Sequence, residues 1–522
     1  TKITLPALQA HLWRGADILR GSVNASEYRN YLLPLLFLKR LSDKFEEEAE
    51  EWEEKLLAQG FSPIEAHRRA WENPEFHTFL VPPEARWDQI LKNMDRIGEA
   101  INEALKAVEE ANLQLLKNVL TRVDFADSNR ISQDTLRRLV KHFSSCRLKD
   151  RDFAEPDLMG RAYEYLLKQF AEEAGRRGGE FYTPREVVRL MVEILKPEEG
   201  MSICDPTVGT GGMLLECAAY VKRRGGNSEN LILHGQEKNP DVWAMCKMNM
   251  LLHGLFHARI ELGDIIREPK LVDNGKLITY DRVIANPPFS LKAWGEEFAR
   301  RDPYRRFRYG IPPRNFGDFA FIEHMIAILK PKGKMAVVAP HGVLFRGGSE
   351  EEIRKGIVED DIIEAIIGLP PNIFYYTGIP SCVIVINKAK SENRQGKILF
   401  IDASRDYLEG RNQNFLREED IRKIIETYEA FEDVPGYAKV VSLKEIKENN
   451  FNLSISRYVY PLTEEETIDL NEVMKEIRSL EAEREKLRFK LEQIFPSLIE
   501  NKDEPEKKEK GGTSQLFLFD GK

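Results

Sequence analysis

The four residues Asn286-Pro287-Pro288-Phe289 are the strongest candidates for chemistry in this chain of 522 residues. They directly follow residues 281–285, an apolar run that predicts a strand. An amino group on a planar ring is a poor nucleophile, because its lone pair is delocalised into the ring. An asparagine oxygen and a backbone carbonyl, fixed by two prolines, can accept both N–H hydrogens and draw that lone pair toward an electrophile. The motif therefore predicts methylation of such a group without a strong general base. Phe289 would stack on a flipped base, although a strand-terminating loop without chemistry is the alternative.

A second cluster, Asp205-Pro206-Thr207-Val208-Gly209-Thr210-Gly211-Gly212, lies between a predicted strand and a helical run that begins near Met213. Glycines in such a turn let the backbone approach a ligand closely, and the N-terminus of the following helix presents free N–H groups. The glycine spacing differs from the GxGxxG pattern of dinucleotide-binding loops, so this loop is a weak signal by itself.

Two further acids come at the ends of the next two predicted strands. Glu237 could take two ribose hydroxyls, and Asp264 could accept a hydrogen bond from an adenine amino group. Together with Asp205 they line one rim of the predicted sheet, where open α/β sheets bind ligands. Taken singly, each acid could be a solvated turn residue; as an ordered set, they favour a cofactor of the adenosyl type.

The elements that would position these residues are short apolar runs that alternate with helical stretches from about residue 185 onward. This alternation predicts a mostly parallel α/β sheet covered on both faces. The predicted strands are residues 201–204, 231–235, 259–262, 282–285, 334–339, 362–367 and 382–386.

Helical segments flank the predicted sheet domain, which we place at residues 156–460. Residues 1–155 carry an apolar stripe and a charged run with few strand signals, which predicts an N-terminal all-α domain. Residues 461–499 predict a coiled-coil or bundle helix that pairs with a partner helix or docks on its own chain. Its stripe consists of Val473, Ile477, Leu480, Leu487, Leu491 and Ile494, with Arg484 at the remaining seam position. Residues 500–522 have the composition of a disordered tail and end in the apolar peptide 515–519.

Composition narrows the class of protein. The longest apolar runs are far shorter than the ~18–20 residues of a membrane span, so we expect no membrane location. The net charge of −9 argues against a stand-alone nucleic-acid binder. A local basic stretch could contact a DNA backbone, or it could be a solvated loop or a partner contact. It contains Arg300, Arg301, Arg305, Arg306, Arg308 and Arg314.

The five cysteines are scattered, without a CxxC pair or a zinc-like His cluster. We therefore expect no structural metal and a reduced cytoplasm. The start of the chain shows no secretory signal pattern.

Four parts of the sequence resemble, in order, motifs I to IV of the amino-group DNA methyltransferases. They are Asp205 to Gly212, Glu237, Asp264 and Asn286 to Phe289. The run Gly179-Glu180-Phe181-Tyr182-Thr183-Pro184-Arg185 resembles their motif X, which helps hold the methionine part of the cofactor. Motif X precedes the others without a long insertion, which is similar to the gamma arrangement of N6-adenine enzymes.

The resemblance extends to the modification subunits of Type I restriction-modification systems. Residues 12–21 and 35–43 are similar to their N-terminal helical domain, residues 317–321, 340–346 and 369–379 to later motifs, and residues 453–458 to their C-terminal signature. Val208 departs from the family, which often has a smaller residue there, and this could narrow the cofactor loop.

This resemblance implies an α/β fold of the S-adenosylmethionine-dependent methyltransferase type: a Rossmann-like, mostly parallel, seven-stranded sheet with an N-terminal all-α domain and a C-terminal helical extension. It implies that Asn286, Pro287, Pro288 and Phe289 hold a flipped adenine. The cofactor S-adenosylmethionine would be bound by Glu180, Phe181, Tyr182, Thr183, Pro184, Arg185, Asp205, Thr207, Val208, Gly209, Gly211, Glu237 and Asp264.

The resemblance also implies partners besides DNA. Two modification subunits would clasp the duplex with one specificity subunit, which reads the sequence and could pack on the C-terminal helix. Because the chain has no GxxxxGK[ST] phosphate loop, translocation and cleavage would belong to a separate restriction subunit. The peptide Gln515 to Phe519 resembles a sliding-clamp docking motif, but docking on its own complex is the favoured interpretation.

Three other functions remain open at this point. A glutamine side-chain amide presents the same planar NH₂ group, although the long helical flanks have no evident use in a glutamine methyltransferase. A non-catalytic DNA-binding scaffold could retain the fold, and N4 of cytosine is a third possible target.

Overall fold

The computed structural model describes residues 2–23, 27–174, 182–375, 377–461 and 470–500. The chain divides into a large unit, Thr1–Pro461, and a second unit that begins at Leu462. None of the helices in the described ranges is both long enough and apolar enough to cross a membrane.

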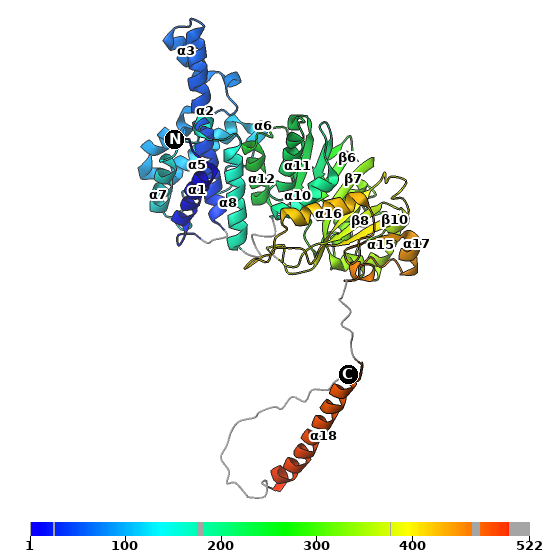
Figure 1. The fold of residues 1–522 in the computed structure, drawn as a ribbon. Helices are drawn as coiled ribbons and strands as arrows, with labels where there is room; N and C mark the ends of the chain where they lie inside the picture. The colour runs from blue at the N-terminus through cyan, green and yellow to red at the C-terminus, as the bar shows by residue number, and fades with distance from the viewer. Residues whose placement is uncertain (1, 24–26, 175–181, 376, 462–469, 501–522) are drawn as a thin grey trace. The chain divides into compact units, whose positions relative to one another are not determined.

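The N-terminal part of the large unit is built from helices (Figure 1). These are α1 Leu5–Leu19, α2 Tyr28–Ala58, α3 Pro63–Glu72, α4 Trp87–Lys92, α5 Ile97–Ala111, α6 Leu113–Leu116, α7 Gln133–Ser144 and α8 Leu158–Ala174. The side chains of Ser62 and Ser132 cap α3 and α7 by accepting backbone N–H groups of the first turn. Before β1, the described residues contain isolated bridges but no strand. The predicted helical N-terminal region is therefore confirmed.

In the described residues, a nine-stranded sheet follows, in the order β11-β10-β8-β9-β7-β6-β1-β2-β3. Its strands are β1 Ser202–Asp205, β2 Ile232–Glu237, β3 Arg259–Leu262, β6 Tyr280–Ala285, β7 Leu329–Pro340, β8 Ile363–Gly368, β9 Ser381–Asn387, β10 Lys397–Asp402 and β11 Ala438–Ser442. Strands β4 Val272–Asp273 and β5 Lys276–Leu277 form a separate small ladder. Neighbours in the large sheet run parallel, except that β9 is antiparallel to β7 and β8, and β11 to β10.

All seven predicted runs are strands of this sheet, and the mostly parallel arrangement is confirmed. The expected number of strands was wrong, because the described sheet has nine. The two additional strands, β10 and β11, extend it beyond β8, with β11 pairing antiparallel to β10 along five residues.

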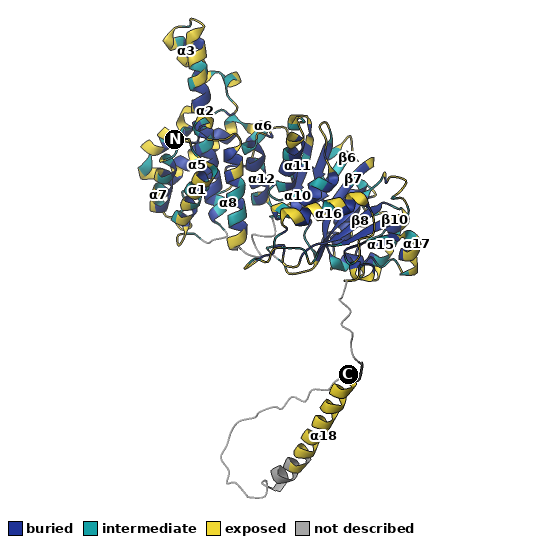
Figure 2. Ribbon diagram, viewed as in Figure 1, coloured by how far each residue is buried: buried dark blue, intermediate teal, exposed yellow. Residues whose placement is uncertain are grey.

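Helices cover both faces of the sheet. One set is α10 Arg185–Leu195, α11 Gly212–Arg223, α12 Pro240–Leu252 and α16 Glu418–Ala430; the other is α14 Asp318–Ala327, α15 Ser349–Glu359 and α17 Leu443–Glu448. The short helix α13 Glu296–Ala299 contributes Ala299 to a separate small cluster. Successive strand residues point to opposite faces, so Ile203 joins the core under α10 to α12 and Cys204 joins the core under α14 and α15. The N-terminal helices share the first of these cores. Figure 2 shows the strands buried between the two layers.

The second unit is described over the helix α18 Leu470–Glu500, which confirms the helical extension. Four members of the predicted apolar stripe, Ile477, Leu480, Leu487 and Leu491, are 44–59% exposed (Figure 2). The side chains of Val473 and Ile494, and the peptide 515–519, lie outside the described residues.

Candidate active site

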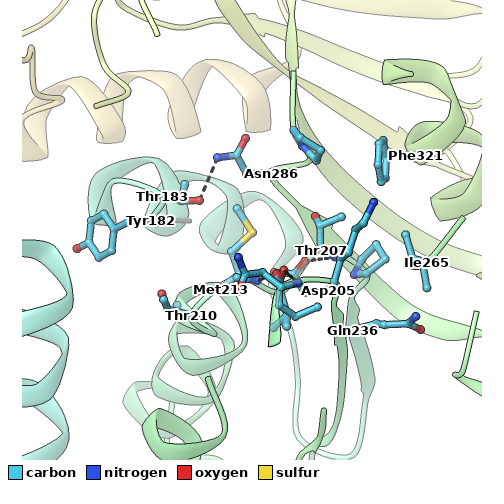
Figure 3. A pocket seen from close by; sticks show the side chains of 18 of the residues that line it. Tyr182, Thr183, Asp205, Thr207, Thr210, Met213, Gln236, Ile265, Asn286 and Phe321 are labelled. Atoms are coloured by element: carbon cyan, nitrogen blue, oxygen red, sulfur yellow. Dashed lines mark hydrogen bonds between the residues drawn. The ribbon is translucent and has the colours of Figure 1, made fainter. Parts of the chain in front are cut away.

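A pocket of about 410 Å³ at the carboxyl ends of the central strands gathers most of the predicted site residues (Figure 3). The predicted residues that line it are Tyr182, Thr183, Asp205, Thr207, Val208, Gly209, Glu237, Asp264, Asn286 and Pro288. Five other predicted residues do not line it: Pro184, Arg185, Gly211, Pro287 and Phe289. The remaining two, Glu180 and Phe181, lie outside the described residues. The pocket therefore joins the two clusters that the sequence placed at neighbouring strand ends.

The glycine loop between β1 and α11 is held by hydrogen bonds at several points. The N–H of Gly209 donates to Glu237 Oε2 at 3.0 Å, and Asn249 Nδ2 of α12 donates to the Thr210 carbonyl at 2.9 Å. Gly211 has a φ of +92°, and a Cβ at this position would lie 2.2 Å from Cε of Met250. Glycine is required here for both its conformation and its size.

Val208, the residue that we expect to narrow the cofactor loop, lines the pocket but is only 4% exposed. Its side chain packs on Gly235 of β2, where an added Cβ would stand 2.8 Å from Val208 Cγ2. A glycine in the strand thus makes room for the larger loop residue.

Asp205 ends β1 and is 2% exposed. Burial, with a smaller contribution from the charge of Glu237, raises the pKa of Asp205 to about 8, although the backbone hydrogen bond from Thr207 lowers it. The carboxyl group is therefore held in the pocket at a desolvation cost, which is typical of a side chain retained for a ligand.

Asp264, after β3, has partners that the sequence did not reveal. Its Oδ2 lies 3.0 Å from both Lys238 Nζ and Arg267 Nη1, and its Oδ1 accepts the backbone N–H of Ile266 and Arg267. Burial alone would raise the pKa of Asp264, but hydrogen bonds from Lys238 and Arg267 lower it below its usual value. This carboxylate therefore stays charged at the pocket wall.

Asn286, after β6, is oriented by one hydrogen bond. Its Nδ2 donates to Thr183 Oγ1 at 3.1 Å, although Thr183 precedes Asn286 by 103 residues in the chain (Figure 3). Its Oδ1 is buried and has no hydrogen-bond partner among the described residues. An acceptor that has lost water without gaining a donor costs ~1–3 kcal/mol, and a ligand N–H group at this point would remove that cost.

The loop after Asn286 is fixed at its exit and flanked by an aromatic ring. Ser290, with a φ of +50°, donates its N–H to Asp318 Oδ1 at 2.8 Å, and Asp318 Oδ2 also pairs with Arg346 at 2.9 Å. The ring of Phe289 lies edge-on to Phe374, with 5.9 Å between centroids. Asp318 and Arg346 belong to the two segments, 317–321 and 340–346, that the sequence analysis assigned to later family motifs.

Sequence reasoning missed several lining residues, among them Glu164, Leu167, Met213, Gln236, Lys238, Asn239, Asn249, Ile265, Leu291 and Trp294. Gln236, Lys238 and Ile265 are neighbours of predicted acids and could have been found by adjacency. Glu164 on α8 and Asn249 on α12 come from helices, whose periodic pattern carries no sign of which polar residue faces a ligand.

The chain is similar to known proteins in both sequence and structure. Residues 154–467 match the family model of the N-6 DNA methylases, and residues 8–143 match the model described as the HsdM N-terminal domain. The MjaVII methylase subunit, a Type I restriction enzyme subunit of Methanocaldococcus jannaschii, is 37% identical over 89% of this chain and 80% of its own length. The MjaIX methylase subunit of the same organism is 33% identical over 94% of this chain and 92% of its length.

Among solved structures, the crystal structure of the type I restriction-modification system methyltransferase subunit from Streptococcus thermophilus is similar with a TM-score of 0.76. The two chains are 31% identical, and the similarity covers 88% of this chain and 100% of that one.

Proposed function

Since this chain belongs to the N-6 DNA methylase family and is a methylase subunit of the Type I restriction enzymes, we propose that the pocket at Asn286 is where it methylates adenine at N6. The enzyme is an adenine-specific DNA methyltransferase, and its cofactor is S-adenosylmethionine. The observation that carries the proposed site is the buried Oδ1 of Asn286, which is oriented by Thr183 and has no donor among the described residues.

The residues of the pocket fit S-adenosylmethionine. Thr207 Oγ1, like Asn286 Oδ1, is buried without a partner in the described structure, and the acids Asp205, Glu237 and Asp264 line the same pocket. We assign to these three acids, with the loop at Gly209, the binding of the adenosine and methionine parts. When bound, the cofactor supplies an electrophilic methyl group on a sulfonium.

The protein's own groups would then orient the base. Asn286 Oδ1 and the backbone carbonyl of Pro287 accept the two amino hydrogens and direct the nitrogen lone pair out of the ring plane. Phe289 supplies an aromatic face beside Phe374 for a base that has left the duplex. Positioning of this kind can lower a barrier by ~7–11 kcal/mol, so no strong general base is required.

The protein works with DNA as part of a Type I restriction-modification complex. We propose that two copies bind one specificity subunit and that the exposed stripe of α18 packs on helices of that subunit. Cleavage and translocation are assigned to a separate restriction subunit. Docking of residues 515–519 on a sliding clamp remains a less favoured proposal than docking within the complex. Because the substrate is DNA, we place the reaction in the cytoplasm.

We further propose that residues 1–155 form a helical domain and residues 156–460 the catalytic domain, followed by the helix at 461–499 and the tail at 500–522. The two separate family matches, over 8–143 and 154–467, support this division.

The test of the proposed site is Asn286→Ala in the assembled complex. We expect a loss of turnover of ~10²–10³-fold, as for other single groups that act on the reacting atoms, with unchanged binding of S-adenosylmethionine. Asn286→Asp keeps an acceptor oxygen and serves as the matched control, with more activity than the alanine variant. Wild-type turnover by Asn286→Ala would remove this residue from the mechanism.

A further inference from the structure

Residues 291–316, between the Asn-Pro-Pro-Phe motif and α14, form a basic loop. It holds seven Lys and Arg residues against three acids, in a chain whose net charge is −9. The structure separates its arginines into two groups with different surroundings.

Arg306 is a structural member of the basic loop, because it is 3% exposed and fully engaged. It forms an ion pair with Asp302 at 2.9 Å and donates to the carbonyls of Ile265 and Ile266 at 2.8 and 2.7 Å. These carbonyls directly follow the pocket residue Asp264, so Arg306 ties the basic loop to the wall of the active site. Arg300 and Arg308 are also engaged, Arg300 by Glu296 at 2.5 Å and Arg308 by Asp360 and the hydroxyl of Tyr309.

The second group consists of Arg301, Arg305 and Arg314. All three are exposed, and within the described ranges no carboxylate lies within ion-pair distance of them. Arg301 and Arg305 line an open hollow together with Arg300 and Arg308. The one acid that lines this hollow, Asp302, is neutralised by Arg306 in the buried pair. In the described structure, the hollow therefore presents the charges of Arg301 and Arg305 without an ion-pair partner.

The basic loop is continuous with the active-site pocket. Its residues Leu291 and Trp294 line that pocket, and Trp294 Nε1 donates to the Pro313 carbonyl at 3.0 Å. The N–H of Ala293, the residue before Trp294, donates to the carbonyl of Arg314, also at 3.0 Å, so Arg314 stands at the base of the loop. Arg314 lines a second hollow, where the two acids Glu296 and Glu297 pair with Arg300 and Arg267. A flipped base remains bonded to its backbone, so the phosphates on either side of it must lie at the mouth of the pocket that receives it.

We propose that the basic loop binds the phosphate backbone of duplex DNA beside the flipped adenine, through Arg301, Arg305 and Arg314, with Arg306 holding the loop rigid. The proposal rests on the proposed function of the pocket. Phosphate contacts fix the register of a protein on DNA without reading sequence, which suits a subunit that leaves sequence recognition to its partner. The local positive charge of the basic loop also explains how a chain with an acidic net charge can contact DNA.

The test uses the complex with the specificity subunit and the double variant Arg301→Gln/Arg305→Gln. The matched control is the double variant Lys332→Gln/Arg422→Gln. Both residues are exposed and without an ion pair in the described structure. Lys332 lies near the start of β7, at the opposite end of that strand from the carboxyl end. Binding of sheared genomic duplex DNA is measured between about 50 and 300 mM salt, a range that includes the physiological salt concentration. S-adenosylmethionine binding and subunit composition are measured on the same samples.

We expect the slope of log affinity against log salt to fall in magnitude by about 2, one for each lost phosphate contact, with about tenfold weaker DNA binding near physiological salt. Cofactor binding and the control variant should match the wild type. An unchanged slope would overturn the proposal, and loss of the specificity subunit from the variant would assign the basic loop to a protein interface instead. A wild-type complex that binds DNA but transfers no methyl to adenine would refute the proposed function while leaving this binding comparison readable.

Discussion

The buried carboxyl of Asp205 makes a quantitative prediction about stability. Burial raises its pKa to about 8 in the ligand-free protein, from 3.8 for an ordinary aspartate. Between these two values the folded chain holds a proton that the unfolded chain releases. The stabilising contribution of this group is therefore fully present below pH 3.8 and is lost as the pH rises through about 8. Each pH unit within the window costs ~1.4 kcal/mol, so the loss from about pH 5.5 to 7.5 is ~2.5 kcal/mol.

Asp205→Asn removes the titration while keeping an oxygen that can accept the N–H of Thr207. We expect the wild type to lose ~2.5 kcal/mol more stability than the variant between about pH 5.5 and 7.5, because the other titrating groups are common to both proteins. The assay is urea unfolding followed by far-UV circular dichroism, on proteins freed of S-adenosylmethionine. We also expect the variant to bind the cofactor more weakly, so that it gains stability at the expense of function.

The result that would refute this reasoning is an equal loss of stability in both proteins over the same pH window. The carboxyl of Asp205 would then be ionised in the folded protein without its ligand, and burial would not govern its pKa.

Three further predictions follow from single contacts. Arg306→Met should destabilise the chain by ~3–5 kcal/mol in thermal or urea unfolding, because its carboxylate partner stays buried without a counter-charge; a loss below about 0.5 kcal/mol would contradict this. Gly211→Ala should weaken S-adenosylmethionine binding in calorimetry, because the residue needs a positive φ and has no room for a Cβ; wild-type affinity in this variant would contradict the role of the glycine loop. Leu480→Ser/Leu487→Ser should leave the unfolding of the isolated chain unchanged but abolish co-purification with the specificity subunit; retained co-purification would show that α18 is not the contact.

The central strands could be predicted from the sequence because each is a short apolar run buried on both faces. Of the two strands that were missed, β10 is also a short apolar run with a buried centre, so its own pattern could have predicted it, whereas β11 at the edge of the sheet could not be predicted in the same way. β11 at Ala438–Ser442 is short and partly exposed, and it is a strand because it pairs with β10, a contact between distant segments. For β11, the strand count therefore depended on tertiary pairing that local patterns do not contain.

The candidate site shows a similar division. The positions of Asp205, Glu237 and Asn286 at strand ends were predictable, because parallel strands bring their carboxyl ends to one edge. The hydrogen bond from Asn286 to Thr183 joins segments far apart in the chain, and no spacing rule predicts it. In the same way, a run of arginines gave no sign that Arg306 alone would be buried among backbone carbonyls.

The most direct test of the central claim is transfer of labelled methyl from S-adenosylmethionine to genomic DNA, with this chain alone and with the specificity protein encoded beside it, followed by nucleoside analysis. We predict label in N6-methyladenine only when both proteins are present. Label in N4-methylcytosine or in protein glutamine, or no transfer with any pairing, would contradict the account.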